Sequence, residues 1–404
     1  MRRTAWILLV LFVFSIPWEY SLDLGAPYGN VARVLGLLTV LAALPAVLEA
    51  GSFRRFSSMH WLTSLLYLWF CCSFFWTETA HETLTHLRGY AQEMMLVWLV
   101  WEFVDLSKDL YLLLRAWLAG SWILAILTIV GFVLSSASTV DQVRFAAIGQ
   151  DPNDVARFLS FGFPIAMLLL HDSMHRTERA LWLFYFPVGF AAVLLTASRS
   201  GLLAALVALT GTGIAAFRRH AKGVIITSVL VGSAVLLIWG VAPVGTFHRL
   251  GTIAELWQLG DLNQRVNIWS SGWRAFQTAP LFGHGVGSFV TAAELGPEDT
   301  AHNTVISILV EGGLCGLALA SAIIFSSMKA ICNLQGSRRF GLSMLMIVWA
   351  VSSIAGTVWE NRLTWLLFGV AAVSSRLAKY ECTERETLNR NSGWIMNEAG
   401  EGAD

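Results

Sequence analysis

The chain has 404 residues, of which 56% are hydrophobic and only 13% are charged, and its formal net charge is zero. A soluble domain carries about a quarter charged residues, so most of this chain is expected to be solvated by lipid. No basic region suited to nucleic acid is present, and the cysteines form neither a CxxC pair nor a zinc-type spacing with histidine. The composition therefore predicts an integral membrane protein that binds no nucleic acid.

Apolar stretches follow one another along most of the chain. A helix needs roughly 20 apolar residues to cross a bilayer core, and its backbone polar groups must be paired internally there. We therefore predict an all-α fold, a polytopic membrane protein with about twelve transmembrane helices. The expected spans are residues 4–18, 31–49, 59–76, 89–104, 110–135, 156–171, 181–197, 201–217, 223–242, 303–327, 341–358 and 363–378.

Basic residues concentrate in alternate connections between these spans, which by the positive-inside rule face the cytoplasm. They are Arg2, Arg3, Arg54, Arg55, Lys108, Arg176, Arg179, Arg218, Arg219, Lys222, Arg338, Arg339, Arg376 and Lys379. Both termini are expected on that side, with the first span retained as a signal anchor.

Four regions follow from this pattern. Residues 1–242 hold the first nine predicted spans, and residues 303–380 hold the last three. Residues 243–302 form a long loop on the opposite, periplasmic side, and loops of this length in compact domains are usually functional. Residues 381–404 are a polar cytoplasmic tail that we expect to be disordered.

The long loop is predicted to contain two helices and a glycine turn. Residues 246–259 are weakly amphipathic, and Asp261 is a plausible N-cap for a second helix that carries Arg265 and ends before Pro280. The glycines of segment 283–287 are expected to let backbone amides approach a ligand, although the segment matches no dinucleotide or P-loop pattern.

His302 lies at the end of the loop, directly before the tenth predicted span, with Asn303 or Thr304 as the expected helix cap. The helix dipole disfavours a positive charge at this position, so His302 is predicted to be neutral, as a general base must be. The alternative is a hydrogen-bonded surface histidine at the membrane interface. His284, within the glycine turn, is a rival base.

Two arginines on the periplasmic side complete the candidate site. Arg199 lies in the turn Ser198-Arg199-Ser200-Gly201, where membrane topology requires no basic residue, and a charge near lipid is a functional hypothesis. The alternative for Arg199 is snorkelling to lipid headgroups, and for Arg265 an ordinary exposed position. If both converge with His302, their guanidinium groups suit a pyrophosphate.

Acidic residues near the site have structural alternatives. Glu311 is expected to form a buried hydrogen bond to a neighbouring span. The carboxylates of Glu294, Glu298 and Asp299 either bind a cation together with His302 or form a solvated acidic turn, and we favour the acidic turn.

Taken in order, the motifs resemble those of O-antigen ligases and the related O-antigen and exopolysaccharide polymerases. The agreement runs from about residue 150 to residue 325. The motifs are Asp151-Pro152-Asn153 leading into an Ala156-Arg157-Phe158-Leu159 helix, Ser198-Arg199-Ser200-Gly201, Asn263-Gln264-Arg265, Pro280-Leu281-Phe282-Gly283-His284-Gly285, Ala301-His302-Asn303 and Glu311-Gly312-Gly313-Leu314-Cys315-Gly316.

The resemblance implies a C-type, inverting and metal-independent glycosyltransferase without a cofactor. Its donor would be a glycan on undecaprenyl pyrophosphate, and its acceptor a sugar of the lipid A core in the bacterial inner membrane. By position, Arg199 and Arg265 would bind the pyrophosphate, and His302 would activate the acceptor hydroxyl. Ser198, Asn303 and His284 are supporting candidates.

The residues themselves agree with this chemistry. Glycoside hydrolysis uses a paired acid and base because an alcohol leaves poorly. A lipid pyrophosphate leaves readily, so one base and charge stabilisation suffice. Two alternatives stay open: a polymerase that joins lipid-linked repeat units, and a membrane transporter, although transporters usually place charges near the bilayer midplane on repeated helices.

Overall fold

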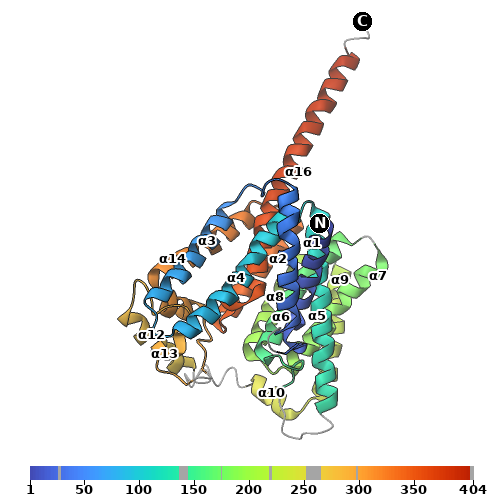
Figure 1. Cartoon of the computed structure of the whole chain (residues 1–404). Helices are drawn as coiled ribbons and strands as arrows, with labels where there is room; N and C mark the ends of the chain where they lie inside the picture. The colour runs from blue at the N-terminus through green and yellow to red at the C-terminus, as the bar shows by residue number, and fades with distance from the viewer. Residues whose placement is uncertain are drawn as a thin grey trace.

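The computed structural model of the chain describes residues 1–25, 29–135, 144–173, 175–217, 221–251, 265–296 and 299–400, without the side chains of 216–217, 221–223 and 384–400. Within these ranges the regular structure is helical, and one isolated bridge joins Asp23 and Asn30 (Figure 1). The predicted all-α class is confirmed.

Each predicted span corresponds to one long helix. These helices are α1 (Arg2–Ser15), α2 (Val31–Glu49), α3 (Ser58–Cys72), α4 (Ala80–Phe103), α5 (Ser107–Ser135), α6 (Pro152–Asp172), α7 (Arg176–Leu195), α8 (Arg199–Phe217), α9 (Ala221–Val241), α14 (Thr304–Cys332), α15 (Gly336–Ile354) and α16 (Arg362–Gly400). Short 3-10 helices η1 (Ile16–Ser21), η2 (Ser73–Phe75) and η3 (Val358–Glu360) lie in the connections.

Seven helices of the described chain are long and apolar enough to cross a membrane, and α8 adds a shorter apolar stretch. The seven are α1 continued by η1, α2, α5, α6, α7, the described part of α9, and α14. A polytopic membrane protein is therefore confirmed, and the full number of spans stays a prediction.

The two ends of the bundle differ. Both termini lie at one end, from which α16 projects, whereas α10 (Val244–Gly251), α12 (Arg265–Thr278) and α13 (Phe289–Ala292) lie at the other end (Figure 1). This is the arrangement that the alternation of basic residues predicts. We refer to the two as the terminal end and the loop end.

Two details of the prediction change. The tail expected to be disordered continues α16 as helix to Gly400. Proline is absent from this stretch, and extending an anchored helix needs no new nucleation step. In the loop, the short helix α13 was not predicted, while Asp261 and residues 252–259 lie outside the described ranges.

Helix α14 is broken where the glycine segment of the loop crosses it. Gly313 has φ +64°, and a Cβ there would lie 2.4 Å from the Leu281 carbonyl oxygen. The crossing segment supplies hydrogen bonds at the break: His284 N donates to Val310 O at 2.8 Å, and Leu314 N donates to Pro280 O at 2.8 Å. The glycines thus permit close packing of loop on helix.

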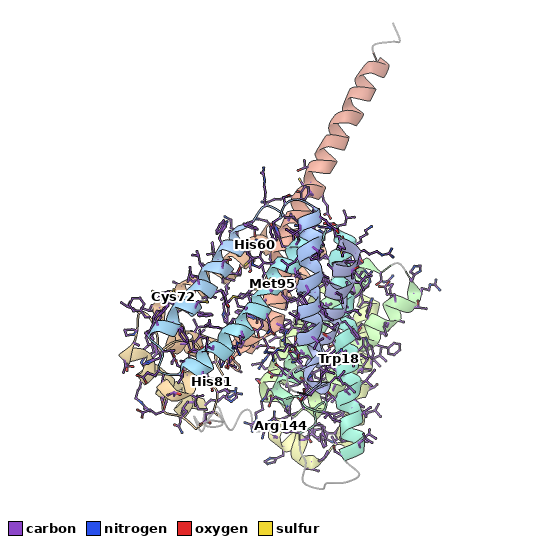
Figure 2. The ribbon with its side chains drawn as sticks, viewed as in Figure 1. Trp18, His60, Cys72, His81, Met95 and Arg144 are labelled. Atoms are coloured by element: carbon purple, nitrogen blue, oxygen red, sulfur yellow. The ribbon has the colours of Figure 1, made fainter. Side chains whose placement is uncertain are left out.

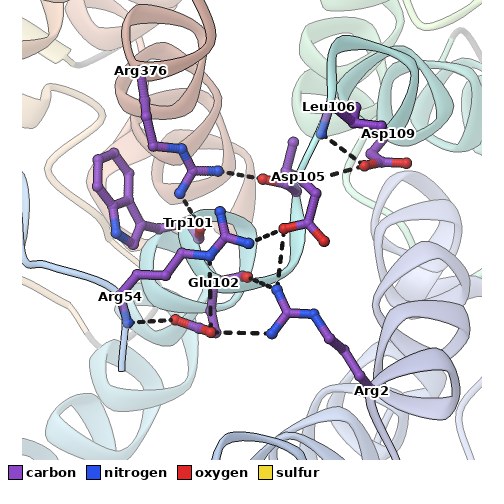
Figure 3. A network of polar contacts seen from close by, with 9 residues as sticks. Arg2, Arg54, Trp101, Glu102, Asp105, Leu106, Asp109 and Arg376 are labelled. Carbon is purple, nitrogen blue, oxygen red and sulfur yellow. Dashed lines mark hydrogen bonds and ion pairs between the residues drawn. The ribbon is translucent and has the colours of Figure 1, made fainter. Parts of the chain in front are cut away.

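Charged side chains join four elements at the terminal end (Figure 3). Arg2 of α1 pairs with Glu102 at 3.3 Å and with Asp105 at 3.1 Å. Arg54, before α3, pairs with Asp105, and its backbone N–H donates to Glu102 Oε2 at 3.1 Å. Arg376 of α16 donates to the Trp101 carbonyl at 2.7 Å. The network fixes α1, α4 and α16 together.

Candidate active site

The turn between α7 and α8 brings Arg199 to the loop end. Ala197 has φ +47°, which bends the chain sharply between the helices. Gly201 then lets α8 lie directly on α6, because a Cβ at Gly201 would be 2.1 Å from the Ala156 Cβ. The predicted Ser198-Arg199-Ser200-Gly201 motif is thus a tight connection that needs its glycine.

The Asp151-Pro152-Asn153 motif holds this turn in place. Asp151 caps α6 and accepts a hydrogen bond from Asn153 N at 2.7 Å. Asn153 Oδ1 accepts from Ser198 Oγ at 2.8 Å and from Arg144 Nη2 at 2.9 Å. Ser198, predicted as a supporting residue, therefore positions the turn through Asn153.

Helix α10 of the loop docks on the same turn. Arg199 Nε donates to the Arg249 carbonyl at 2.9 Å, and Arg249 Nε donates back to the Ala197 carbonyl at 3.3 Å. These reciprocal bonds orient the half-buried Arg199 and add a second arginine, Arg249, beside it.

Arg265 of α12 shares the electrostatic environment of Arg199. Burial lowers the pKa of Arg265, and the charges of Arg157 and Arg199 lower it further, while Asp151 opposes them. Burial and the charges of Arg249, Arg199 and Arg265 likewise lower the pKa of Arg144, against the opposing charge of Asp151. Arginines from separate segments therefore converge, including the two that the sequence predicted.

His302 lies beside this cluster. Burial lowers the pKa of His302, and the Arg265 charge is the next largest cause. Arg157 acts in the same direction, whereas Asp151 and Asp154 raise the pKa. A lowered pKa favours the neutral imidazole, and the charges that act on it belong to α6, its N-cap Asp151 and α12.

The backbone at His302 is unusual. Its φ is +45°, a left-handed conformation that costs free energy for a residue with a Cβ. The next residue, Asn303, caps α14 by accepting from Val305 N at 3.0 Å and Ile306 N at 3.1 Å, and it donates to the Ile354 carbonyl at 3.2 Å. The cap therefore fixes the backbone position from which the His302 side chain extends.

Two further contacts hold the His302 segment. Thr304 Oγ1 donates to the Gly356 carbonyl at 2.8 Å and accepts from Val358 N at 3.0 Å. These two bonds attach the start of α14 to the connection between α15 and α16. Trp269 Nε1 of α12 donates to the Ala301 carbonyl at 3.0 Å. The histidine is therefore positioned from both sides.

Arg157 belongs to the Ala156-Arg157-Phe158-Leu159 motif, but the sequence assigned it no role in the candidate site. It is only 8% exposed, pairs with Asp154 at 2.7 Å, and packs against Gly356, where a Cβ would be 2.3 Å from its Nη2. Its charge acts on both Arg265 and His302. The sequence did contain a signal for Arg157. It is a charged residue in the apolar run after Asp151-Pro152-Asn153, and it follows Asp154 by three residues.

His284 and Glu311 serve packing. His284 Nε2 lies 2.9 Å from the Ala275 carbonyl and 3.0 Å from Thr278 Oγ1, so its ring is tied to the end of α12. The buried Glu311 carboxyl group accepts hydrogen bonds from the backbone of Gly287 and Phe289. Its partners thus belong to the loop, not to a neighbouring span.

The acidic turn is organised locally. Asp299 Oδ2 accepts from Gly296 N at 3.1 Å, and Glu294 has φ +54°. Glu298 lies outside the described ranges. Among the residues that are described, no three His, Cys, Asp or Glu side chains are grouped as metal ligands.

These features define an all-helical membrane protein with an arginine cluster and a neutral histidine at one end of its bundle. Residues 184–321 match the model of the Wzy_C family, described as O-antigen ligase. The match includes Arg199, Arg265 and His302 and confirms the resemblance to the O-antigen ligase superfamily. It indicates an enzyme of the ligase or polymerase type that acts on lipid-linked glycans. No curated protein matches the chain.

Proposed function

We propose that the protein is an O-antigen ligase of the bacterial inner membrane. It would transfer a glycan from undecaprenyl pyrophosphate to the lipid A core at the periplasmic face, by an inverting, metal-independent reaction. The observation that carries the proposal is the convergence of Arg157, Arg199 and Arg265 with the neutral His302. The closest alternative within the superfamily is a polymerase that joins lipid-linked repeat units.

The arginine cluster suits the donor. Cationic side chains that lower one another's pKa repel, and a bound anion relieves that repulsion. A pyrophosphate places adjacent negative charges that Arg199 and Arg265 bind through their guanidinium forks. Arg157, which pairs with Asp154 and acts electrostatically on Arg265, adds a third positive charge that stabilises the leaving group as its negative charge grows.

His302 performs the proton transfer. Its neutral imidazole takes the proton of the acceptor hydroxyl while that oxygen attacks the anomeric carbon of the donor sugar. The bond from this carbon to the pyrophosphate oxygen breaks, undecaprenyl pyrophosphate leaves with the electron pair, and the anomeric configuration is inverted. Because the base and the arginines supply both roles, we expect EDTA to leave the transfer rate unchanged.

Replacement of His302 tests the proposal in cells. His302→Ala should abolish polymer on lipid A while long lipid-linked chains accumulate, as seen by gel analysis of lipopolysaccharide and of extracted lipid carriers. His81→Ala, at an exposed position of α4 at the same end of the bundle (Figure 2), is the matched control and should behave as wild type. Accumulation of single lipid-linked repeat units would instead assign the polymerase reaction, and unchanged lipopolysaccharide would reject His302 as the base.

A further inference from the structure

A second polar feature lies at the loop end, outside the arginine cluster. A pocket of about 170 Å³ opens between α4 and η3, and it is lined by Thr85, His86, Gly89, Tyr90, Glu93 and Glu360. Sites for drug-sized ligands measure roughly 300–1,000 Å³, so this pocket has room for a small ligand only. None of the six lining residues is lysine or arginine.

The pocket adjoins the segments that position His302. His86 packs on the glycine segment of the loop, where a Cβ at Gly287 would lie 2.6 Å from its Cδ2. Glu360 follows two residues after Val358, whose N–H donates to Thr304 Oγ1 at 3.0 Å. The loop and the α15–α16 connection therefore contact both the arginine–histidine site and the pocket.

The pocket presents acceptors for hydrogen bonds. Glu93 Oε2 is buried and has no hydrogen-bond partner among the described residues. Glu360 Oε2 lies 3.7 Å from His86 Nδ1. A buried acceptor without a partner is costly, and a donor group on a ligand removes that cost.

The lining of the pocket selects among ligands. It contains no lysine or arginine, so the pocket offers a phosphate no counter-charge, whereas hydroxyl groups donate hydrogen bonds to carboxyl oxygens. The Tyr90 ring adds an apolar surface of the kind that polar ligand sites commonly include. The ligand class that fits is an uncharged sugar.

We propose that this pocket binds the acceptor, as a hydroxyl-rich sugar residue without phosphate. The inference rests on the proposed glycan transfer and adds the second substrate to it. The two sites then differ in chemistry, because the arginines attract the pyrophosphate whereas the lining of the pocket offers it no cation. This difference separates the donor from the acceptor.

Binding to the full-length protein in lipid nanodiscs tests the pocket without catalysis. The probe is core oligosaccharide from which acyl chains and phosphates have been removed, titrated calorimetrically. Glu93→Gln should weaken its binding about tenfold, since it replaces one carboxyl oxygen, a hydrogen-bond acceptor, with an amide group that only donates. Glu82→Gln, with the same change at an exposed position of α4, is the control and should bind as wild type.

Each outcome decides one point. Absence of binding to wild type, or equal affinity in Glu93→Gln and wild type, would overturn the pocket. Glu360→Gln provides the same test if Glu93→Gln does not fold. Wild type that binds the oligosaccharide but transfers no glycan would leave the pocket standing and reject the proposed function. Preference for a released repeat-unit oligosaccharide would keep the pocket and assign it to a polymerase.

Discussion

At the scale of single residues, the proposed mechanism requires His302 to accept a proton. Its left-handed backbone is fixed by the Asn303 cap, and burial together with the Arg265 charge keeps its imidazole neutral. A base of this kind is active above its pKa, so lowering that pKa extends activity toward acid pH. In the proposed mechanism, Arg265 therefore both binds the donor and lowers the pKa of the base.

The pH dependence of transfer follows from this pairing. Because the pKa of His302 is lowered, the rate should rise with pH through a value below the ordinary histidine pKa of about 6.5 and be constant above it. Arg265→Gln removes a charge that lowers this pKa, so the rising limb should move to higher pH. The measurement is kcat/KM for the acceptor against pH.

Arg274→Gln is the control for this experiment, since Arg274 is an exposed arginine of the same helix α12. In Arg274→Gln, the rising part of the plot of kcat/KM against pH should stay at the wild-type pH, and the transfer rate should be unchanged. A limb that does not move in Arg265→Gln would show that Arg265 does not act on the base.

Sequence patterns were informative for some site residues and silent for others. Arg199 was predicted because the sequence alone shows a basic residue in a connection expected on the periplasmic side. His302 was predicted because the sequence shows a histidine directly before a helix. The role of Arg157 was missed because it depends on contacts with Gly356 and on charges from α12, which only the fold brings together. The anchoring of His284 on α12 is equally invisible in sequence.

At the scale of elements, the α6–α8 contact positions Arg199. Gly201→Val should lower the thermal unfolding midpoint of the purified protein, because the new side chain meets Ala156 where a Cβ has only 2.1 Å. Overpacking of this kind costs about 1–3 kcal/mol. Gly213→Val, in the same helix with nothing within 4 Å of the added Cβ, should leave the midpoint unchanged. Equal midpoints for the two variants would contradict the packing argument.

Helix positions were predictable to a greater extent than helix shape. A long apolar run indicates a segment that lies in lipid, where the backbone must form a helix to pair its polar groups. The long helices were therefore expected where they occur. Hydropathy does not report a break inside a helix, and the left-handed Gly313 in α14 was therefore not expected. The polar tail was misjudged because polarity alone does not show whether a preceding helix continues.

At the scale of the whole molecule, the distribution of basic residues predicts which end faces the cytoplasm. Cys332 and Cys382 are exposed near the terminal end, and Asp299 lies in the loop. In intact cells a membrane-impermeant thiol reagent should label Asp299→Cys in a cysteine-free background. Two further proteins retain either Cys332 or Cys382 as their single cysteine, and the reagent should label these proteins after cell lysis but not in intact cells. The reverse pattern would invert the topology and place the candidate site in the cytoplasm.

The break in α14 has a consequence for the biogenesis of the protein. A helix interrupted within lipid leaves backbone groups without partners, and here the segment from Pro280 to Gly285 provides them. Translation completes this segment before α14, so the loop must be available on the far side of the membrane when α14 inserts. Variants of Gly283 or Gly313 should accordingly fail to pair the loop with α14, and they should be degraded without reaching the native fold. Their loss of activity would report failed assembly and would carry no information about chemistry.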